Sequence, residues 1–141
     1  MALKLVYEPI TIGTVEVPNR IVRSAHGTCL AQGGLIGGRL IDYHLARAKG
    51  GVGLSILEAG SVHPSSVLDL ALFDDRITAG HKKLMAAVAP YGMRVFQQIW
   101  HAGHAYPAYN GAPPWGASAL PNPTTGLVSA DGDRFRYMFV R

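Results

Sequence analysis

The chain has 141 residues, of which 48% are hydrophobic and 16% charged, and a formal net charge of +4. A disordered chain would be less apolar and more charged, so we expect about one domain with a buried core. The single cysteine, Cys29, excludes an internal disulfide and a four-thiolate metal site, and the scattered basic residues argue against nucleic-acid binding.

The first 25 residues are predicted to be extended. Apolar side chains alternate on both sides of Gly13-Thr14, and this pattern predicts two short extended pieces. Their apolar positions are Leu3, Leu5, Tyr7, Ile10, Ile12, Val15 and Val17. Residues 20–25 then resemble a buried strand, and a glycine-rich polar stretch follows to Gly38.

A helix and a second strand are predicted next. Apolar residues recur at helical spacing from Arg39, and Lys49-Gly50-Gly51 has the composition of a basic last turn with a glycine stop. The near-continuous apolar run at 52–57 suits a strand that is covered on both faces. Glu58-Ala59-Gly60 is expected to close that strand.

After a polar loop at 63–75, Thr78 is expected to cap a second helix. Pro90 makes continuation past Ala89 costly. Residues 93–99 are predicted to form the third strand. Beyond Tyr106 the proline-rich and glycine-rich composition is typical of loops, with one further extended segment expected at 135–140.

The order β-α-β-α-β predicts an α/β fold, for which two architectures compete. In a TIM (β/α)₈ barrel the strand-to-helix loops form the active face and tend to lengthen, as they do here. A doubly wound open sheet favours a tight glycine-rich phosphate turn after the first strand. The long loop after residue 25 does not fit that turn, so the barrel is favoured.

The ends of the three predicted strands carry the candidate chemistry. These segments are 24–28, 58–60 and 98–103, and parallel neighbouring strands would place them on one rim. Small residues there let a flat ring approach the backbone. Gln98 offers both donors and an acceptor, which suits the pyrimidine edge of a flavin, a nucleobase or an amide-bearing substrate.

Other readings of single residues are less favoured. His101 and His104 have no nearby carboxylate or cysteine, so no metal site is expected. We interpret Glu58 as a structural group rather than a general base, His44 as structural, and Trp100 as a packing residue.

Several motifs follow one another along residues 3–121. They are Pro18-Asn19-Arg20-Ile21-Val22 with Ser24-Ala25-His26-Gly27-Thr28, residues 47–54 running to Glu58-Ala59, residues 80–84 with Gln97-Gln98-Ile99-Trp100-His101-Ala102-Gly103, and residues 114–119. In this order they resemble the Old Yellow Enzyme family of NADH:flavin oxidoreductases. The resemblance implies a flavoprotein with the N-terminal portion of a TIM barrel, about three βα units long, after a short β-hairpin.

The resemblance also implies cofactors and site residues. FMN would lie against Ala25, His26 and Gly27, with the backbone N–H of Ala59 at the ring and Gln98 at the pyrimidine edge. NADH or NADPH would supply a hydride for an activated alkene or related acceptor. His26 and His104 resemble the branch with trimethylamine-dehydrogenase-like and bile-acid or dienoyl-CoA reductase-like proteins, so the acceptor stays open.

The division expected is a hairpin at 1–18, a βαβαβ unit at 19–105 and a loop-rich tail at 106–141, together a partial FMN-binding domain. A whole barrel needs about 250 residues, so we expect a fragment that binds FMN weakly alone and tends to associate, including as a homo-oligomer. The alternative is a non-catalytic half-barrel module completed by another chain. With no signal peptide and no run approaching a membrane span, a cytoplasmic protein with small-molecule partners is expected.

Overall fold

The computed structural model describes residues 2–106, 111, 113–116 and 119–129. It begins with a 3-10 helix, η1 (Ala2–Tyr7), where an extended piece was predicted. That part of the prediction is wrong: the alternation is short and has no partner strand among the described residues, and Glu8 N–H instead donates to Leu5 O at 3.3 Å, closing a turn. The predicted hairpin follows as β1 (Ile10–Ile12) and β2 (Val15–Val17), paired antiparallel around Gly13, whose φ is +62°.

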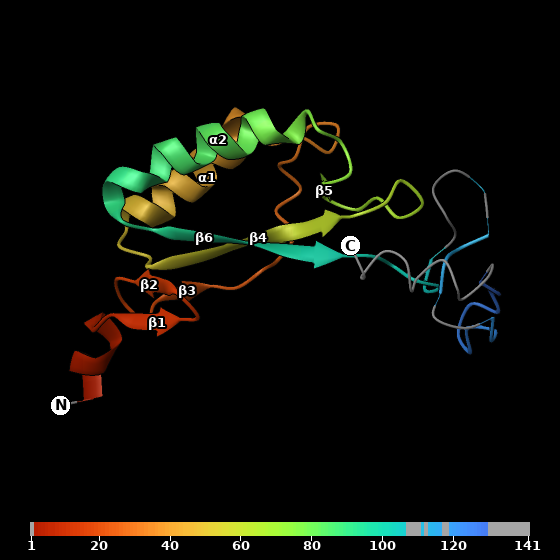
Figure 1. The fold of residues 1–141 in the computed structure, drawn as a ribbon, viewed down its shortest axis with the longest axis horizontal. Coiled ribbons are helices and arrows are strands. Elements are labelled where there is room, and N and C mark those ends of the chain that lie inside the picture. Colours follow the sequence, from red (N-terminus) through yellow and green to blue (C-terminus); the bar gives the residue numbers. More distant parts are fainter. Residues whose placement is uncertain (1, 107–110, 112, 117–118, 130–141) are drawn as a thin grey trace.

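The main sheet has four strands: β3 (Val22–Arg23), β4 (Leu54–Ser61), β5 (Leu70–Ala71) and β6 (Arg94–Trp100). β4 lies between β3 and β6, and every pairing in this sheet is parallel. β4 is the central strand, and its pairing with β6 is the longest in the sheet (Figure 1). The carboxyl ends of β3, β4 and β6 therefore meet at one edge.

Both long helices cover the same face of this sheet. α1 (Gly38–Lys49) and α2 (Ile77–Val88) lie side by side above β4 and β6 (Figure 1). A short 3-10 turn, η2 (Ala89–Tyr91), follows α2 and ends at Gly92, whose φ is +73°. The core between helices and sheet is made of buried apolar side chains: Ile36, Leu40, Ala48, Leu57, Leu70, Ile77, Leu84, Val88 and Met93.

This arrangement separates the two architectures left open by the sequence. Successive crossovers move in one direction along β3, β4 and β6, so right-handed connections place both helices on one face. A doubly wound sheet has helices on both faces. The described part of the chain is thus an α/β unit with the winding of a partial (β/α)₈ barrel.

Strand boundaries differ from the predictions at three places. β3 is only two residues long, and Val22 is 48% exposed, because the edge of β3 away from β4 has no partner among the described residues. β4 does not close at residues 58–60 but runs to Ser61 through a bulge between Leu57 and Gly60. β5 was not predicted, since a two-residue strand has no recognisable period.

The predicted cap of α2 is also wrong. The helix begins at Ile77 with Arg76 as its N-cap, and no side chain caps it. Ile77 N–H instead donates to the backbone oxygen of Asp74 at 3.0 Å, so the preceding turn already winds the chain. The extended segment predicted at 135–140 lies outside the described residues. No helix in the described part of the chain is long and apolar enough to cross a membrane.

Candidate functional site

The predicted rim consists of three segments on neighbouring strands. Ala25, His26 and Gly27 follow β3, Ala59 lies within β4 at its bulge, and Gln98 lies within β6. Because β4 separates β3 from β6, the Ala59 segment is the middle of this rim. We call these five residues the rim residues.

The rim residues differ in exposure in a way that suits a flat ligand. Ala59 is buried, whereas Gly27 and Gln98 are exposed. The side-chain amide of Gln98 makes no hydrogen bond with the part of the chain that the structure describes. Its donors and its acceptor are therefore free to pair with an edge that carries both.

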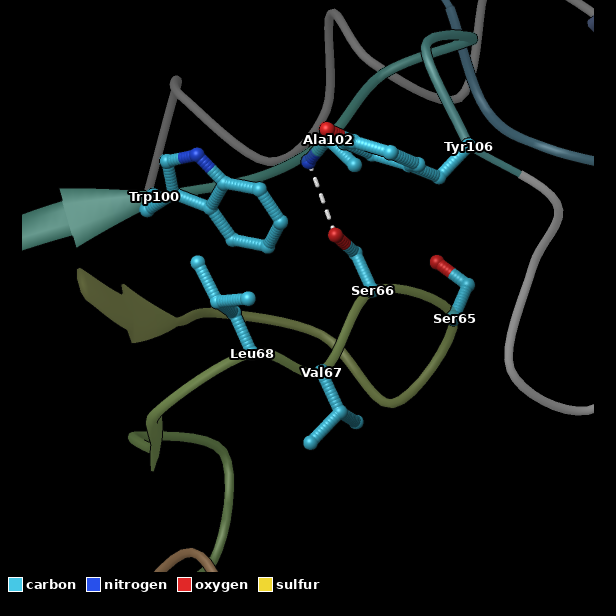
Figure 2. Close-up of a pocket in the computed structure, with 7 residues that line it drawn as sticks. All are labelled: Ser65, Ser66, Val67, Leu68, Trp100, Ala102 and Tyr106. Atoms are coloured by element: carbon cyan, nitrogen blue, oxygen red, sulfur yellow. Dashed lines mark hydrogen bonds between the residues drawn. The ribbon is translucent and has the colours of Figure 1, made fainter. Parts of the chain in front are cut away.

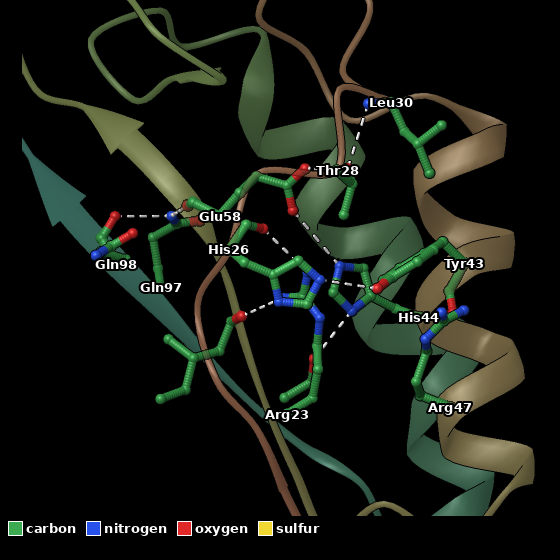
Figure 3. A network of polar contacts seen from close by, with 12 residues as sticks. Arg23, His26, Thr28, Leu30, Tyr43, His44, Arg47, Glu58, Gln97 and Gln98 are labelled. Atoms are coloured by element: carbon green, nitrogen blue, oxygen red, sulfur yellow. Dashed lines mark hydrogen bonds and ion pairs between the residues drawn. The ribbon is translucent and has the colours of Figure 1, made fainter.

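His26 is exposed, and its imidazole is turned toward α1. Its Nδ1 lies 3.2 Å from the backbone oxygen of Ser24, and its Nε2 lies 3.2 Å from Arg23 and 3.1 Å from Tyr43 Oη (Figure 3). A guanidinium only donates and a carbonyl only accepts, so Nδ1 carries the proton and Nε2 accepts. His26 thus offers its backbone to the rim.

Arg23 is a buried residue that sequence reasoning missed. Its guanidinium donates to the backbone oxygen of Ile56 at 2.5 Å and to that of His26 at 3.1 Å, and it lies over the ring of Tyr43 at 5.2 Å. Arg47 lies on the same ring at 3.3 Å. An arginine inside an apolar strand was the available signal, because a buried charge needs such partners.

Beneath the rim, Glu58 is completely buried and belongs to a polar network (Figure 3). Thr28 Oγ1 donates to Glu58 Oε1 at 2.5 Å, and His44 Nε2 lies 3.7 Å from Oε2. His44 is also buried and contacts Ser55 Oγ at 3.0 Å. Burial raises the pKa of the Glu58 carboxyl, but His44 and Thr28 lower it by more, so that this pKa lies below its usual value. Both side chains have partners inside the fold, and their structural role stays a prediction.

Asp69, which the sequence did not single out, lies directly against the rim. A Cβ on Gly27 would come within 3.1 Å of Asp69 Oδ2, so glycine leaves the space that this carboxylate occupies. Burial, and after it the charge of Glu58, raise the pKa of Asp69. Asp69 precedes β5, and Leu70 of β5 pairs with Gly60, so Asp69 is next to the middle of the rim.

A cavity of about 450 Å³ opens beyond the rim, between the β4–β5 loop and the segment after β6 (Figure 2). Its walls are Ser65, Ser66, Val67, Leu68, Trp100, Ala102 and Tyr106. Trp100 lines this cavity, and its interpretation as a packing residue stays a prediction. Ser66 Oγ accepts a hydrogen bond from Ala102 N–H at 2.7 Å and holds the two walls together. Strand alternation places Gln98 and Trp100 on one face of β6.

Two histidines and a tryptophan support this cavity from behind. Ser65 Oγ lies 2.8 Å from His63 Nδ1 and 3.1 Å from His101 Nε2, and the His63 ring stacks on Trp115 with centroids 3.8 Å apart. Burial lowers the pKa of His63 and of His101, and the charge of His63 lowers the latter further. Within the described ranges, no group of three or more potential metal-ligating side chains occurs.

Comparison with known proteins places this geometry in a family. A profile of the NADH:flavin oxidoreductase / NADH oxidase family matches residues 5–126. An NADH oxidase of Thermoanaerobacter brockii is 46% identical over 97 residues, which cover 65% of this chain and 15% of that protein. An NADPH dehydrogenase of Bacillus subtilis is 37% identical over 110 residues, which cover 73% of this chain and 32% of that protein.

Solved structures agree on the fold. Morphinone reductase in complex with tetrahydroNAD superposes with a TM-score of 0.81 at 22% identity, covering 94% of this chain and 42% of that one. Old Yellow Enzyme from a Pichia species gives a TM-score of 0.71 at 26% identity, covering 82% of this chain and 32% of that one. The chain thus spans only 15% to 32% of the length of these curated relatives. It belongs to the NADH:flavin oxidoreductase / NADH oxidase family and has the fold of part of the Old Yellow Enzyme barrel.

Proposed function

We propose that this chain supplies the flavin-ring rim of an FMN-dependent oxidoreductase, which passes a hydride from NADH or NADPH to an activated alkene or related acceptor. The family membership supports FMN, and the relatives named NADH oxidase and NADPH dehydrogenase support a nicotinamide reductant. The chemistry that FMN supplies when bound is hydride transfer, while the protein contributes position and electrostatics.

One observation carries the proposal: the rim residues lie on, or directly after, three adjacent parallel strands, with the free amide of Gln98 at one side and the buried Ala59 in the middle. The donor set fits the cofactor. Gln98 would pair with the pyrimidine edge, and the backbone at Ala25, His26 and Gly27 would lie against the ring. Small residues at three of the five rim positions leave room for an aromatic system to approach the main chain.

The cavity next to the rim would hold the acceptor. Its volume of about 450 Å³ is within the range of about 300–1,000 Å³ that small-molecule sites occupy. Its walls combine aromatic and aliphatic surface from Trp100, Tyr106 and Leu68 with the hydroxyl of Ser66. This composition favours an apolar acceptor with one polar group, which the hydroxyl would orient.

A chimera tests the proposal in a complete barrel. Residues 1–105 would replace the matching segment of the Bacillus subtilis NADPH dehydrogenase, to which this chain is 37% identical. We expect the chimera to purify with flavin and to oxidise NADPH in the presence of an alkenone. Gln98→Leu should remove most of the bound flavin, and Glu8→Gln, an exposed change outside the rim, should not. A folded chimera without flavin, or one indifferent to Gln98→Leu, would refute the assignment.

A second candidate is a non-catalytic half-barrel module that another chain completes. Among the described residues, the outer edges of β3 and β6 have no partner strand, and Ile99 on β6 is 68% exposed. Unpaired edges with exposed apolar side chains favour association. A defined homo-oligomer or hetero-complex in size analysis would support this candidate, and aggregates of broad size would count against it. A cytoplasmic location remains part of either proposal.

A further inference from the structure

Each rim segment has a polar residue directly beside it in the chain. Each of the three rim segments is followed or preceded by a residue of a single polar network on the helix-covered side of the sheet. Thr28 follows Gly27, Glu58 precedes Ala59, and Gln97 precedes Gln98. Adjacent residues are joined by rigid peptide units, so whatever holds these three side chains also limits where the rim backbone can move.

Glu58 is the residue that joins the three. Its carboxylate accepts the hydrogen bond of Thr28 at 2.5 Å, and its backbone oxygen accepts one from Gln97 Nε2 at 2.7 Å. The amide of Gln97 is held in turn from α2, where His81 Nε2 lies 3.2 Å from Gln97 Oε1. These contacts connect the loop after β3, the bulge of β4 and the strand β6 through one residue.

α1 completes the network from above. His44 lies 3.7 Å from the second carboxylate oxygen of Glu58 and 3.0 Å from Ser55 Oγ. Both His44 and Glu58 are completely buried, and a charged group in such a place is retained only with partners that stabilise it. The bulge between Leu57 and Gly60 lies at this residue, where ladder hydrogen bonds alone fix the backbone less firmly.

We propose that Glu58 is a positioning residue for the flavin rim: its carboxylate and its backbone oxygen fix the Gly27, Ala59 and Gln98 segments relative to one another. This inference rests on the function proposed above for the rim itself. It assigns Glu58 no contact with cofactor or substrate. The residue acts through Thr28, which contacts its carboxylate, and through Gln97, which contacts its backbone oxygen.

The charge of Glu58 has a second effect at the same place. Asp69 lies against Gly27, and burial, and after it the charge of Glu58, raise the pKa of the Asp69 carboxyl. Glu58 thereby influences the electrostatics of the rim as well as its geometry. The pKa of Asp69 is therefore a readout that a purely structural role of Glu58 would not change.

The experiment uses the 141-residue chain and amide spectra of three variants. Glu58→Leu removes both carboxylate oxygens, Glu58→Gln keeps an oxygen that can accept from Thr28, and Leu57→Val is the control at a buried neighbour that faces the helices. We expect Glu58→Leu to shift the amide resonances of Gly27 and Ala59, because it removes the carboxylate that accepts from Thr28. Hydrogen exchange at Ala59 should become faster by on the order of tenfold. A further variant, Gln97→Leu, removes the donor to the Glu58 backbone oxygen and should shift the amides of Ala59 and Gln98. Glu58→Gln should restore the amide positions, while Leu57→Val should leave them in place.

Thr28→Val keeps the proposal testable if Glu58→Leu does not fold. This nearly isosteric change removes the hydroxyl, which donates to Glu58 Oε1 and also accepts from Leu30 N–H at 3.2 Å. We expect it to shift Ala59 as well as Gly27, because Glu58 transmits the loss. Shifts confined to the Gly27 segment would overturn the proposal. Equal shifts in Leu57→Val and Glu58→Leu, or no shift in the latter, would overturn it too.

Riboflavin titration of the same samples separates this proposal from the proposed function. If the wild-type chain takes up no riboflavin while the rim amides still depend on Glu58, the positioning role stands and the flavin assignment fails. If Glu58→Leu binds riboflavin at the rim with wild-type affinity, the flavin assignment stands and the positioning role fails.

Discussion

Gly60 offers the sharpest test of how the rim is packed. It lies in β4 directly after Ala59, and a Cβ at this position would overlap Leu72 and come within 2.8 Å of Gln97 Nε2. Alanine here must displace the Gln97 amide, which donates to the Glu58 backbone oxygen at 2.7 Å. Overpacking of this kind costs about 1–3 kcal/mol, and the lost hydrogen bond about 1 kcal/mol. Alanine also lowers the conformational entropy of the unfolded chain, which raises the free energy of unfolding by about 0.4–1 kcal/mol.

The net expectation for Gly60→Ala is a loss of about 1–3 kcal/mol in the free energy of unfolding. Urea unfolding followed by circular dichroism measures it, as a lower midpoint with an unchanged slope. Gly38→Ala is the matched control, because a Cβ on this first residue of α1 meets nothing within 4 Å. It should be neutral or slightly stabilising. If Gly60→Ala unfolds at the wild-type or Gly38→Ala midpoint, β4 and β6 are not packed as described.

The remaining predictions concern the titrating groups near the rim and cavity. Glu58→Gln should lower the pKa of Asp69 toward its usual value, because it removes the negative charge that helps to raise this pKa. Carbon-13 spectra of the Asp69 carboxyl measure the change. An unchanged pKa would show that burial alone raises it. His63 and His101 have pKa values below the ordinary 6.5, so the unfolded chain binds protons more readily. The two neutral imidazoles therefore contribute fully to the free energy of unfolding above pH 6.5. This contribution is lost as the pH falls through their lowered pKa values in the folded chain. In a Trp100→Phe background, the fluorescence of Trp115, which stacks on His63, should change over that acidic range, and a response that persists unaltered in His63→Gln would contradict this explanation.

Long periodic elements were predictable because their signals are local. The helical spacing of Leu40, Ile41, Leu45 and Ala48 predicted α1, in which Leu40 and Ala48 are buried. The apolar run at 52–57 overlaps the buried strand β4, which begins at Leu54. The alternative architectures were separated only by the structure, since the face on which a helix packs depends on the crossovers. The lengths of β3 and β5 were missed because both strands are defined by pairing with β4 rather than by a pattern of their own.

The candidate site was predictable in part for a similar reason. Strand ends can be located from the sequence, so the three segments around Ala25, Ala59 and Gln98 were found as segments on adjacent strands. Contacts across the fold could not be found this way. Asp69 is 42 positions from Gly27 along the chain, and their proximity depends on β5 pairing beside β4. The turn of the His26 ring toward Arg23 and Tyr43 is likewise a tertiary effect.

The measurement that tests the central claim most directly compares riboflavin with FMN on this chain by amide chemical shifts. Under the proposed assignment the rim residues hold the flavin by its ring, so both ligands should bind weakly, with similar affinity, and shift the amides of Ala25, His26, Gly27, Ala59 and Gln98. Gln98→Leu should weaken both equally. Shifts that lie elsewhere, or FMN binding far more tightly than riboflavin, would contradict the claim that this chain holds the flavin by its ring.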